Sequence, residues 1–348
     1  MELASKPAYL ALAAVGATLL ATTMGMFSKN QMPVEGKTIL ITGGSDGMGL
    51  SVSRQLAAKG ANIIIVARNV GKLEEAIVTL KASAKNPESQ RFTYISADVS
   101  EHNYAAAVIA EAIAWNNGKS PDIVWCIAGV ATPDFWVDTP LEVSRRNMDI
   151  NYWGNAEMSH AVLREWLDPS APVTDEPKHF IFTSSVVAFY SIAGYSPYAP
   201  AKIAIRTLAD TLAQEVKLYP QNVEIHVVYP GTILTAGLET ENKSKPEITH
   251  ILEEDDPQQS ADTVARRAIN GLERGEYFVT VAWLGHLMKW GMMGGSPRNN
   301  WLIDTLMQFV VALVWLIVYP IINSKLLSYA KKHGHPATYK LKNANTKR

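Results

Sequence analysis

A tyrosine and a lysine lie four positions apart in the segment Tyr198-Ala-Pro-Ala-Lys202. If a helix begins near Pro197, this spacing places both side chains on one face, one turn apart. A neighbouring ammonium group favours the phenolate, so we expect the pKa of Tyr198 to fall from about 10 towards neutrality. Such a phenol can exchange a proton with a ketone or an alcohol. Ser185 follows an apolar run at residues 179–183 that predicts a buried strand, and its hydroxyl can hydrogen-bond the same substrate oxygen.

A Tyr-x-x-x-Lys pair alone also fits an ordinary helix face, so its interpretation depends on what precedes it. The first predicted strand runs into the first predicted helix through Thr42-Gly-Gly-Ser-Asp-Gly-Met-Gly49. Gly43, Gly47 and Gly49 fit a tight turn, close approach to a diphosphate and close packing of the helix. The free N–H groups at the helix N-terminus favour an anion. In this strand–turn–helix context the motif predicts a dinucleotide site.

The end of the second predicted strand indicates which dinucleotide binds. A ribose-binding carboxylate is expected there, about twenty residues further on, but Ala67 occupies the position and Arg68 follows. This favours the 2′-phosphate of NADP, with Ser45 offering an additional hydroxyl; alternatively, Arg68 only caps the strand. Asp98, after the third predicted strand, is placed either to reach the adenine or to cap the next helix, a role for which Ser100 competes.

These residues require an alternation of strands and helices, which the chain shows from Lys37 to about Val281. The predicted strands are residues 38–42, 62–67, 91–97, 122–127, 179–183, 223–229 and 277–281. The predicted helices are residues 47–59, 70–84, 101–115, 140–166, 198–218 and 256–271. Such alternation implies right-handed crossovers and a parallel sheet covered on both faces. We therefore predict an α/β fold with a Rossmann-type, doubly wound, seven-stranded parallel sheet.

Composition limits the alternatives. The chain has 348 residues, of which 47% are hydrophobic, and a net charge of -1. It can therefore build a large core, and its charge gives no indication of nucleic-acid binding. Cys126 is the only cysteine, so no intrachain disulfide can form, which fits a reducing compartment. We predict no metal site.

Apolar segments flank the α/β pattern. Residues 8–27 and 306–322 carry no charge and approach the ~20 residues that cross a bilayer. Glu2 and Lys6 cancel before the first segment, which favours a membrane anchor over a signal peptide, with a buried helix as a third possibility. Residues 283–295 fit an interfacial segment or a surface helix equally well. From Lys325 to Arg348 the chain is basic and has no acid.

At this point the sequence resembles the short-chain dehydrogenase/reductase family. The matching motifs, in the family's order, are TGGSDGMG, Ala97-Asp98-Val99, Ala128-Gly129, Asn151-Tyr-Trp-Gly154, Ser185, Tyr198-x-x-x-Lys202 and Pro230-Gly231. The resemblance implies a catalytic tetrad in which Tyr198 is the general acid, Ser185 holds the substrate carbonyl and Asn151 holds a water in a proton relay. Lys202 would bind the nicotinamide ribose and tune Tyr198.

The resemblance also implies a set of cofactor-binding residues: Gly43, Ser45, Asp46, Gly47, Gly49, Arg68, Asp98, Val99, Tyr198, Lys202, Pro230, Gly231 and Thr232. Two positions depart from the family pattern. The usual Asn-Ala-Gly is here Cys126-Ile-Ala-Gly129, which removes an Asn that braces the sheet. Asp46 stands where many NADP-dependent members have a basic residue, which leaves Arg68 and Ser45 as the expected readers of the 2′-phosphate.

A closer resemblance is to the 3-ketodihydrosphingosine reductases. It is carried by Leu238-Glu-Thr-Glu-Asn-Lys-Ser-Lys-Pro246, Ile251-Leu-Glu-Glu254, Ile150-Asn-Tyr-x-Gly154 and the hydrophobic segment after the domain. It implies NADPH-dependent reduction of 3-ketosphinganine, a long-chain keto-amine lipid, at the endoplasmic reticulum membrane. Residues 234–238 and the following loop would form walls for an apolar tail. The alternatives are a membrane-anchored reductase of steroid, retinoid or acyl ketones, and a catalytically silent NADP-binding scaffold.

The expected organisation has four parts: an N-terminal anchor and linker at 1–33, an NADP-binding reductase domain at 34–282, membrane-associated segments at 283–325 and a basic tail at 326–348. NADPH, the reducing compartment and the basic tail all favour the cytosol for domain and tail. One crossing by residues 306–322 cannot place both there, so we expect this segment to dip into one leaflet. The sequence leaves the oligomeric state open, a homo-oligomer included.

Overall fold

The computed structural model describes residues 29–338, so the predicted anchor at 8–27 and the end of the basic tail lie outside the described residues. Its centre is a seven-stranded sheet in the order β3-β2-β1-β4-β5-β6-β9. Every neighbouring pair is parallel. The strands are β1 (Thr38–Thr42), β2 (Asn62–Ala67), β3 (Phe92–Ser96), β4 (Ile123–Cys126), β5 (Lys178–Thr183), β6 (Val223–Tyr229) and β9 (Phe278–Thr280). The predicted fold class is confirmed, and the strand order reverses between β1 and β4, where such sheets bind ligands.

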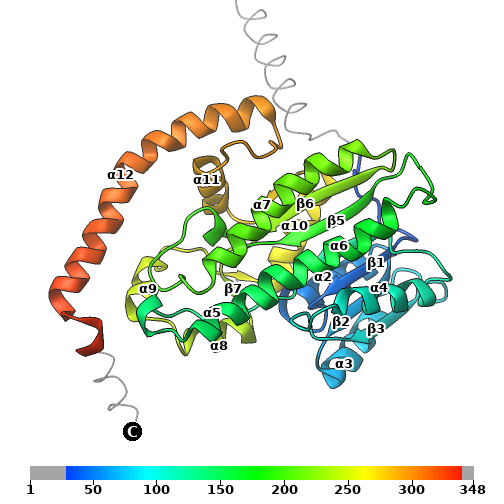
Figure 1. The fold of residues 1–348 in the computed structure, drawn as a ribbon, viewed down its shortest axis with the longest axis horizontal. Coiled ribbons are helices and arrows are strands. Elements are labelled where there is room, and N and C mark those ends of the chain that lie inside the picture. The colour runs from blue at the N-terminus through cyan, green and yellow to red at the C-terminus, as the bar shows by residue number, and fades with distance from the viewer. Residues whose placement is uncertain (1–28, 339–348) are drawn as a thin grey trace, which may run out of the picture.

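Helices cover both faces of this sheet (Figure 1). One core cluster combines Leu40, Ile64 and Val66 with α4 (Tyr104–Trp115), α6 (Gly154–Trp166) and α7 (Ala199–Glu215). The alternate residues Ile39, Ile41 and Ile63 pack on the other face against α2 (Gly47–Ala57), α3 (Val70–Ala82) and α10 (Ala261–Glu273). Successive strand residues point to opposite faces, so a strand buried on both sides reads as a continuous apolar run.

Two predicted helices need correction. The helix predicted at 140–166 is divided into α5 (Leu141–Met148), a π-helical turn (Asp149–Trp153) and α6. The helix predicted from residue 256 begins only at Ala261, because Ser260 caps it by accepting the Thr263 N–H at 3.3 Å. Residues before it form β8 (Gln259–Ser260), which pairs with β7 (Ile233–Leu234). These two-residue strands are too short for a periodic signal.

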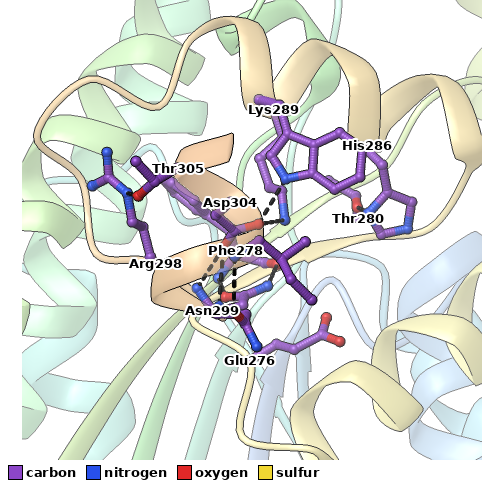
Figure 2. Close-up of polar contacts among 12 residues, drawn as sticks. Glu276, Phe278, Thr280, His286, Lys289, Arg298, Asn299, Asp304 and Thr305 are labelled. Atoms are coloured by element: carbon purple, nitrogen blue, oxygen red, sulfur yellow. Dashed lines mark hydrogen bonds and ion pairs between the residues drawn. The ribbon is translucent and has the colours of Figure 1, made fainter. Parts of the chain in front are cut away.

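After β9 the chain forms α11 (Trp283–Gly291) and the long α12 (Trp301–His333), which curves around the domain (Figure 1). Figure 2 shows the junction between them. The buried Asp304 carboxylate lies 3.2 Å from Lys289 Nζ and accepts the Trp290 indole N–H at 2.6 Å. The Asn299 side chain also pairs with both backbone groups of Phe278, at 2.9 and 2.6 Å. These contacts fix the start of α12 to the edge of the sheet.

Two short helices, α8 (Ala236–Asn242) and α9 (Glu247–Leu252), connect β7 to β8. Within residues 29–338, α12 is the one helix long and apolar enough to cross a membrane by length and composition. It continues to His333, beyond the expected boundary at residue 325. Its apolar surface indicates membrane association.

Candidate active site

The glycine-rich turn is closely packed against its neighbours. Gly43 has φ +71°, and a Cβ there would lie 2.8 Å from the backbone of Ala128. A Cβ on Gly49 would lie 2.0 Å from the Gly43 carbonyl oxygen. Side chains are therefore excluded where the chain passes from β1 into α2, and the first turn of α2 opens at the carboxyl edge of the sheet. This is the cradle that a diphosphate requires.

Four charged side chains lie beyond this turn. Asp46 caps α2 by accepting the Gly47 N–H at 2.7 Å, and its second oxygen pairs with Lys72 Nζ at 2.5 Å. Hydrogen bonding to Lys72 leads the causes that lower the pKa of Asp46. Arg68 Nη1 lies 3.3 Å from Asp98 Oδ2 and is half-exposed. The acid at position 46 is therefore offset by Lys72, a basic residue that the sequence motifs did not indicate.

The turn after β3 does not act as a helix cap. Asp98 Oδ1 accepts the backbone N–H of Ser100 at 2.9 Å and its hydroxyl at 2.7 Å. α4 begins only at Tyr104, and Asn103 holds its N-cap position. The alternative in which Asp98 or Ser100 caps this helix is therefore wrong. Val99 packs on Gly154, where a Cβ would lie 2.8 Å from the Val99 carbonyl oxygen.

The structure brings the expected tetrad residues together from three elements. Tyr198 precedes the first residue of α7, and its phenol lines the same cavity as Ser185, which follows β5 and whose hydroxyl lowers the phenol pKa. Lys202 Nζ lies 5.6 Å from the centre of the Tyr198 ring and donates to the Thr183 carbonyl at 3.0 Å. The predicted spacing on one helical face therefore places the two side chains side by side.

Asn151 reaches the same place from the π-helical turn. Its side-chain amide donates to the Val130 carbonyl at 2.8 Å and accepts the Val130 N–H at 3.2 Å. A Cβ on Gly129 would lie 2.8 Å from Asn151 Oδ1 and 3.4 Å from Lys202 Nζ. This explains the glycine of the Ala128-Gly129 motif, because any side chain at position 129 would push Asn151 and Lys202 apart. A π-helical turn inside a helix is frequent at functional sites.

The expected fall in the pKa of Tyr198 is wrong. Burial raises the pKa of this phenol, the Glu241 carboxylate adds to the rise, and the Ser185 hydroxyl opposes it. Burial also lowers the pKa of the Lys202 ammonium to about 7. Near neutral pH the lysine is only partly charged, so it gives the phenolate less support than a fully charged ammonium would.

Ser185 and Tyr198 open into a cavity of about 670 Å³. Pro230, Gly231 and Thr232, which follow β6, line it beside them. Leu238 also lines it, as expected for the wall at 234–238, whereas Leu234 is exposed. Other lining residues come from α8, from the loop after α9, from α11 and from α12: Gly237, Thr240, Glu241, Glu253, Asp255, Asp256, Leu284, Leu287, Met288, Val311, Val314, Trp315, Val318, Ile321, Ile322 and Lys325.

Comparison with known proteins decides the family. A model described as short chain dehydrogenase matches residues 37–246. The chain belongs to the short-chain dehydrogenase family. It is an oxidoreductase, and membership of this family supports binding of a nicotinamide cofactor at the glycine-rich turn.

Curated relatives match almost the whole chain. A protein of Neurospora crassa named 3-ketodihydrosphingosine reductase is 58% identical over 96% of this chain and 93% of its own length. A 3-ketodihydrosphingosine reductase of Aspergillus fumigatus is 45% identical over 90% of this chain and 89% of its own length. Within the short-chain dehydrogenase family, the chain is thus similar to enzymes named for reduction of a sphingolipid ketone.

Solved structures show the same fold. A short-chain dehydrogenase/reductase from Mycobacterium ulcerans has a TM-score of 0.60 and 24% identity, covering 72% of this chain and 89% of that chain. A short-chain dehydrogenase from Sphingobium yanoikuyae, solved with NADPH, has a TM-score of 0.58 and 21% identity, covering 70% and 87%. At these identities the likeness is one of fold.

The structure also accounts for a departure from the family pattern. Ile127 stands where the family has an asparagine that braces the sheet. Here the Thr42 hydroxyl accepts the N–H groups of Ile127 and Ala128 at 3.2 and 3.3 Å. The ends of β1 and β4 are therefore joined through a threonine side chain.

One wall of the cavity carries an acidic cluster that the motifs did not reveal. Tyr195 Oη lies 2.6 Å from Oε1 of both Glu241 and Glu253. Lys245 Nζ lies 3.0 Å from Glu241 and 2.7 Å from Glu253. Burial, followed by the charge of Glu253, raises the pKa of the adjoining Asp256 to about 6. The opposite wall, from α11 and α12, is apolar except for Lys325.

Proposed function

We propose that this short-chain dehydrogenase reduces 3-ketosphinganine to sphinganine with NADPH in sphingolipid synthesis. The observation that carries the proposal is the cavity itself. A phenol and a hydroxyl suited to a ketone, Tyr198 and Ser185, lie between an acidic wall and an apolar wall. A long-chain keto-amine has a ketone beside an ammonium group and an alkyl chain on the other side. The names of the relatives that match nearly the whole chain support the same substrate.

The residues present fit a nicotinamide dinucleotide. Gly43 and Gly49 let the turn pack closely against the backbone of Ala128 and of the turn itself, and α2 presents its N-terminus where a diphosphate would lie. Arg68 and Lys72, with Ser45, would hold a 2′-phosphate. Asp98 and Val99 would border the adenine, and Pro230, Gly231 and Thr232 the nicotinamide. When bound, the nicotinamide of NADPH supplies the hydride.

The chain's own residues would supply the proton and orient the substrate. The Ser185 hydroxyl would donate to the ketone oxygen, and Tyr198 would transfer its phenolic proton to that oxygen. The raised pKa of Tyr198 keeps the phenol protonated before the reaction, which suits a donor in the direction of reduction. Lys202 would bind the ribose hydroxyls and supply a proton to the Tyr198 phenolate left by the reaction, and Asn151 would hold a water that reprotonates Lys202 from solvent.

The acidic wall would bind the substrate ammonium. Glu241, Glu253 and Asp256 contribute three carboxylates to the cavity, against the one amine of Lys245, whereas Asp255, which pairs with Lys325, is exposed. An excess of buried negative charge favours a cation. Asp256 is the candidate for direct contact because it lines the cavity, and burial and the charge of Glu253 raise its pKa despite the charge of Lys245.

We propose that residues 34–282 form the reductase domain on the cytosolic face of the endoplasmic reticulum membrane, with residues 1–33 and 283–325 membrane-associated and the tail at 326–348 cytosolic. Asn299, just before α12, contacts Phe278 of the domain, and Tyr329, near the end of the helix, contacts Glu247. Attachment of both ends to the same domain supports a helix that lies in one leaflet rather than one that crosses the membrane. The exposed Asn242 begins a sequon, Asn242-Lys-Ser244. It should stay unglycosylated in cells, whereas a glycan on Asn242 would place the domain in the lumen.

The test is direct. Purified protein in detergent or lipid is given 3-ketosphinganine with NADPH, and the product is identified by mass spectrometry. We expect NADPH oxidation and sphinganine in equal amounts. Reduction of steroid, retinoid or simple acyl ketones in its place would refute the substrate, and absence of turnover with cofactor binding intact would identify a scaffold.

A further inference from the structure

The long helix α12 is fixed to the domain near both ends. Near its start, Asp304 forms the junction with Lys289 and Trp290 described above. Near its end, the Tyr329 hydroxyl lies 3.1 Å from Glu247 of α9, and Lys325 lies 3.9 Å from Asp255. The helix therefore has a defined rotation about its axis, with one face held towards the domain and the other away from it.

The face towards the domain closes the catalytic cavity. Val311, Val314, Trp315 and Val318 of α12 line it and recur at the three- and four-residue spacing of one helical face. The Trp315 ring is held firmly, since it lies 4.8 Å from the ring of Tyr190. It also approaches Gly291 so closely that a Cβ there would lie 2.4 Å from the indole nitrogen.

The opposite face of α12 is equally apolar but exposed. Phe309, Leu313, Leu316 and Ile317 are 66–72% exposed. An exposed apolar surface of this kind on a helix indicates contact with lipid. The helix thus separates an apolar outer surface from a cavity that contains Tyr198.

We propose that the inward face of α12, centred on Val314, Trp315 and Val318, is the docking wall for the alkyl chain of the keto-amine substrate. Leu287 and Met288 of α11 complete this wall, and the outward face lies in the membrane. The proposal deepens the proposed function and rests on it for the identity of the substrate. The membrane-associated helix is then part of the substrate site as well as an attachment.

The distribution of charged and apolar walls in the cavity determines the direction of the substrate's alkyl chain. With the ketone at Ser185 and Tyr198, the carboxylates of Glu241, Glu253 and Asp256 occupy one direction and disfavour an alkyl chain. The apolar direction leads to α11 and α12. Each CH₂ that leaves water there strengthens binding about fourfold, so a chain of many methylenes makes α12 the main source of selectivity for length.

The first test compares two tryptophan substitutions on one helix. Val318→Trp narrows the cavity, whereas Leu316→Trp adds the same side chain to the outward face, where Leu316 is 71% exposed. Substrates are 3-ketosphinganine and an analogue with the same head group and only a stub of the chain. We expect Val318→Trp to lower kcat/KM for the long substrate by about tenfold or more, the equivalent of displacing roughly two methylenes, and to leave the short analogue unchanged. Leu316→Trp should change neither.

The outcome that overturns the proposal is an equal effect of Val318→Trp on both substrates, or no effect on either. Thermal unfolding and NADPH binding check that the variant is folded, and an equal loss of activity on both substrates in a folded variant would show that Val318 does not contact the alkyl chain. If the wild-type protein reduces no keto-amine, the proposed function fails, and a second experiment still decides the docking wall.

That second experiment needs no turnover. Cys126 is fully buried and its thiol pKa is raised by burial to about 12, so the native chain is inert to thiol reagents. We introduce Val318→Cys or Leu316→Cys and measure labelling by N-ethylmaleimide with and without sphinganine as the probe. Sphinganine should slow labelling of Val318→Cys severalfold and leave Leu316→Cys unaffected. If sphinganine left the labelling rate of Val318→Cys unchanged, or slowed labelling of both variants equally, the proposal would be overturned.

Discussion

The cofactor side of the cavity is formed mainly by backbone, whereas the substrate side is formed by side chains. On the cofactor side, Gly43 and Gly49 bring backbone against backbone, and the site follows from one short segment at the switch point of the sheet. On the substrate side, the walls are side chains from α8, α9, α11 and α12, which meet only in the folded chain. The first side can bind what every member of the family binds, whereas the second can differ between members.

The largest expected effect tests the point where the two sides meet. Tyr198 lies between the cofactor side and the substrate side, and Tyr198→Phe removes its phenolic proton. We therefore expect kcat to fall by about a hundredfold to ten-thousandfold. Cofactor affinity, measured by NADPH fluorescence, should be unchanged. A rate near that of the wild type would contradict the assignment of the general acid.

The next effect tests the cofactor side alone. Arg68→Ala should weaken NADPH binding by about tenfold to a hundredfold, as expected for loss of a charge-assisted contact, and should change NADH binding little. Lys72→Ala should act in the same direction more weakly, since Lys72 is already paired with Asp46. Equal weakening of both cofactors in calorimetric titrations would show that Arg68 does not read the phosphate.

A smaller effect tests the acidic wall of the substrate side. Asp256→Asn should raise KM for 3-ketosphinganine about tenfold, the equivalent of one contact to a charged group, without changing NADPH affinity. Because the pKa of Asp256 is about 6, the wild-type KM should rise as pH falls below 6 and the carboxylate is protonated. Asp256→Asn should lose this pH dependence; if it keeps it, another group binds the amine.

A last effect, on stability and not on catalysis, concerns buried polar groups away from the cavity. His179 Nδ1 lies 2.9 Å from His226 Nε2, and burial lowers the pKa of these imidazoles to about 3 and about 4. Between about pH 4 and the unfolded value of ~6.5, only the unfolded chain binds these protons, so stability falls on acidification by about 1.4 kcal/mol per pH unit for each imidazole. Urea unfolding at pH 7 and pH 5 measures this.

His179→Gln should reduce that pH dependence, and His160→Gln, at an exposed position on α6, should leave it unchanged. Both variants should keep their activity per folded molecule. A catalytic defect in His179→Gln would show that the His179–His226 pair is coupled to the catalytic cavity, although the structure places the pair away from it.

The sequence predicted what depends on local patterns. The seven strands follow from apolar runs, and the glycine turn and the Tyr198–Lys202 pair follow from spacing along one segment. It did not predict that Lys72 pairs with Asp46, because that contact joins α2 to α3 through exposed side chains. Nor did it predict the direction of the pKa shift of Tyr198. The burial of this phenol depends on residues much later in the sequence that form the walls of the cavity.

The role of α12 shows the same limit. Its composition predicts membrane association, yet it is apolar around its circumference, so no periodicity distinguishes the face that lines the cavity from the face that is exposed. Asp304 and Tyr329 make that distinction through contacts with α11 and α9. The partners of a helix fix its orientation, and a uniform pattern cannot reveal them.

The central claim is that one cavity recognises the ketone, the ammonium and the alkyl chain of the same molecule. The most direct measurement is kcat/KM, with NADPH, for 3-ketosphinganine beside a long-chain ketone that lacks the amine and the keto-amine that lacks the chain. We expect each truncated compound to be reduced at least about tenfold less efficiently, the equivalent of one lost charged contact or roughly two lost methylenes. Equal efficiency for all three compounds would contradict it.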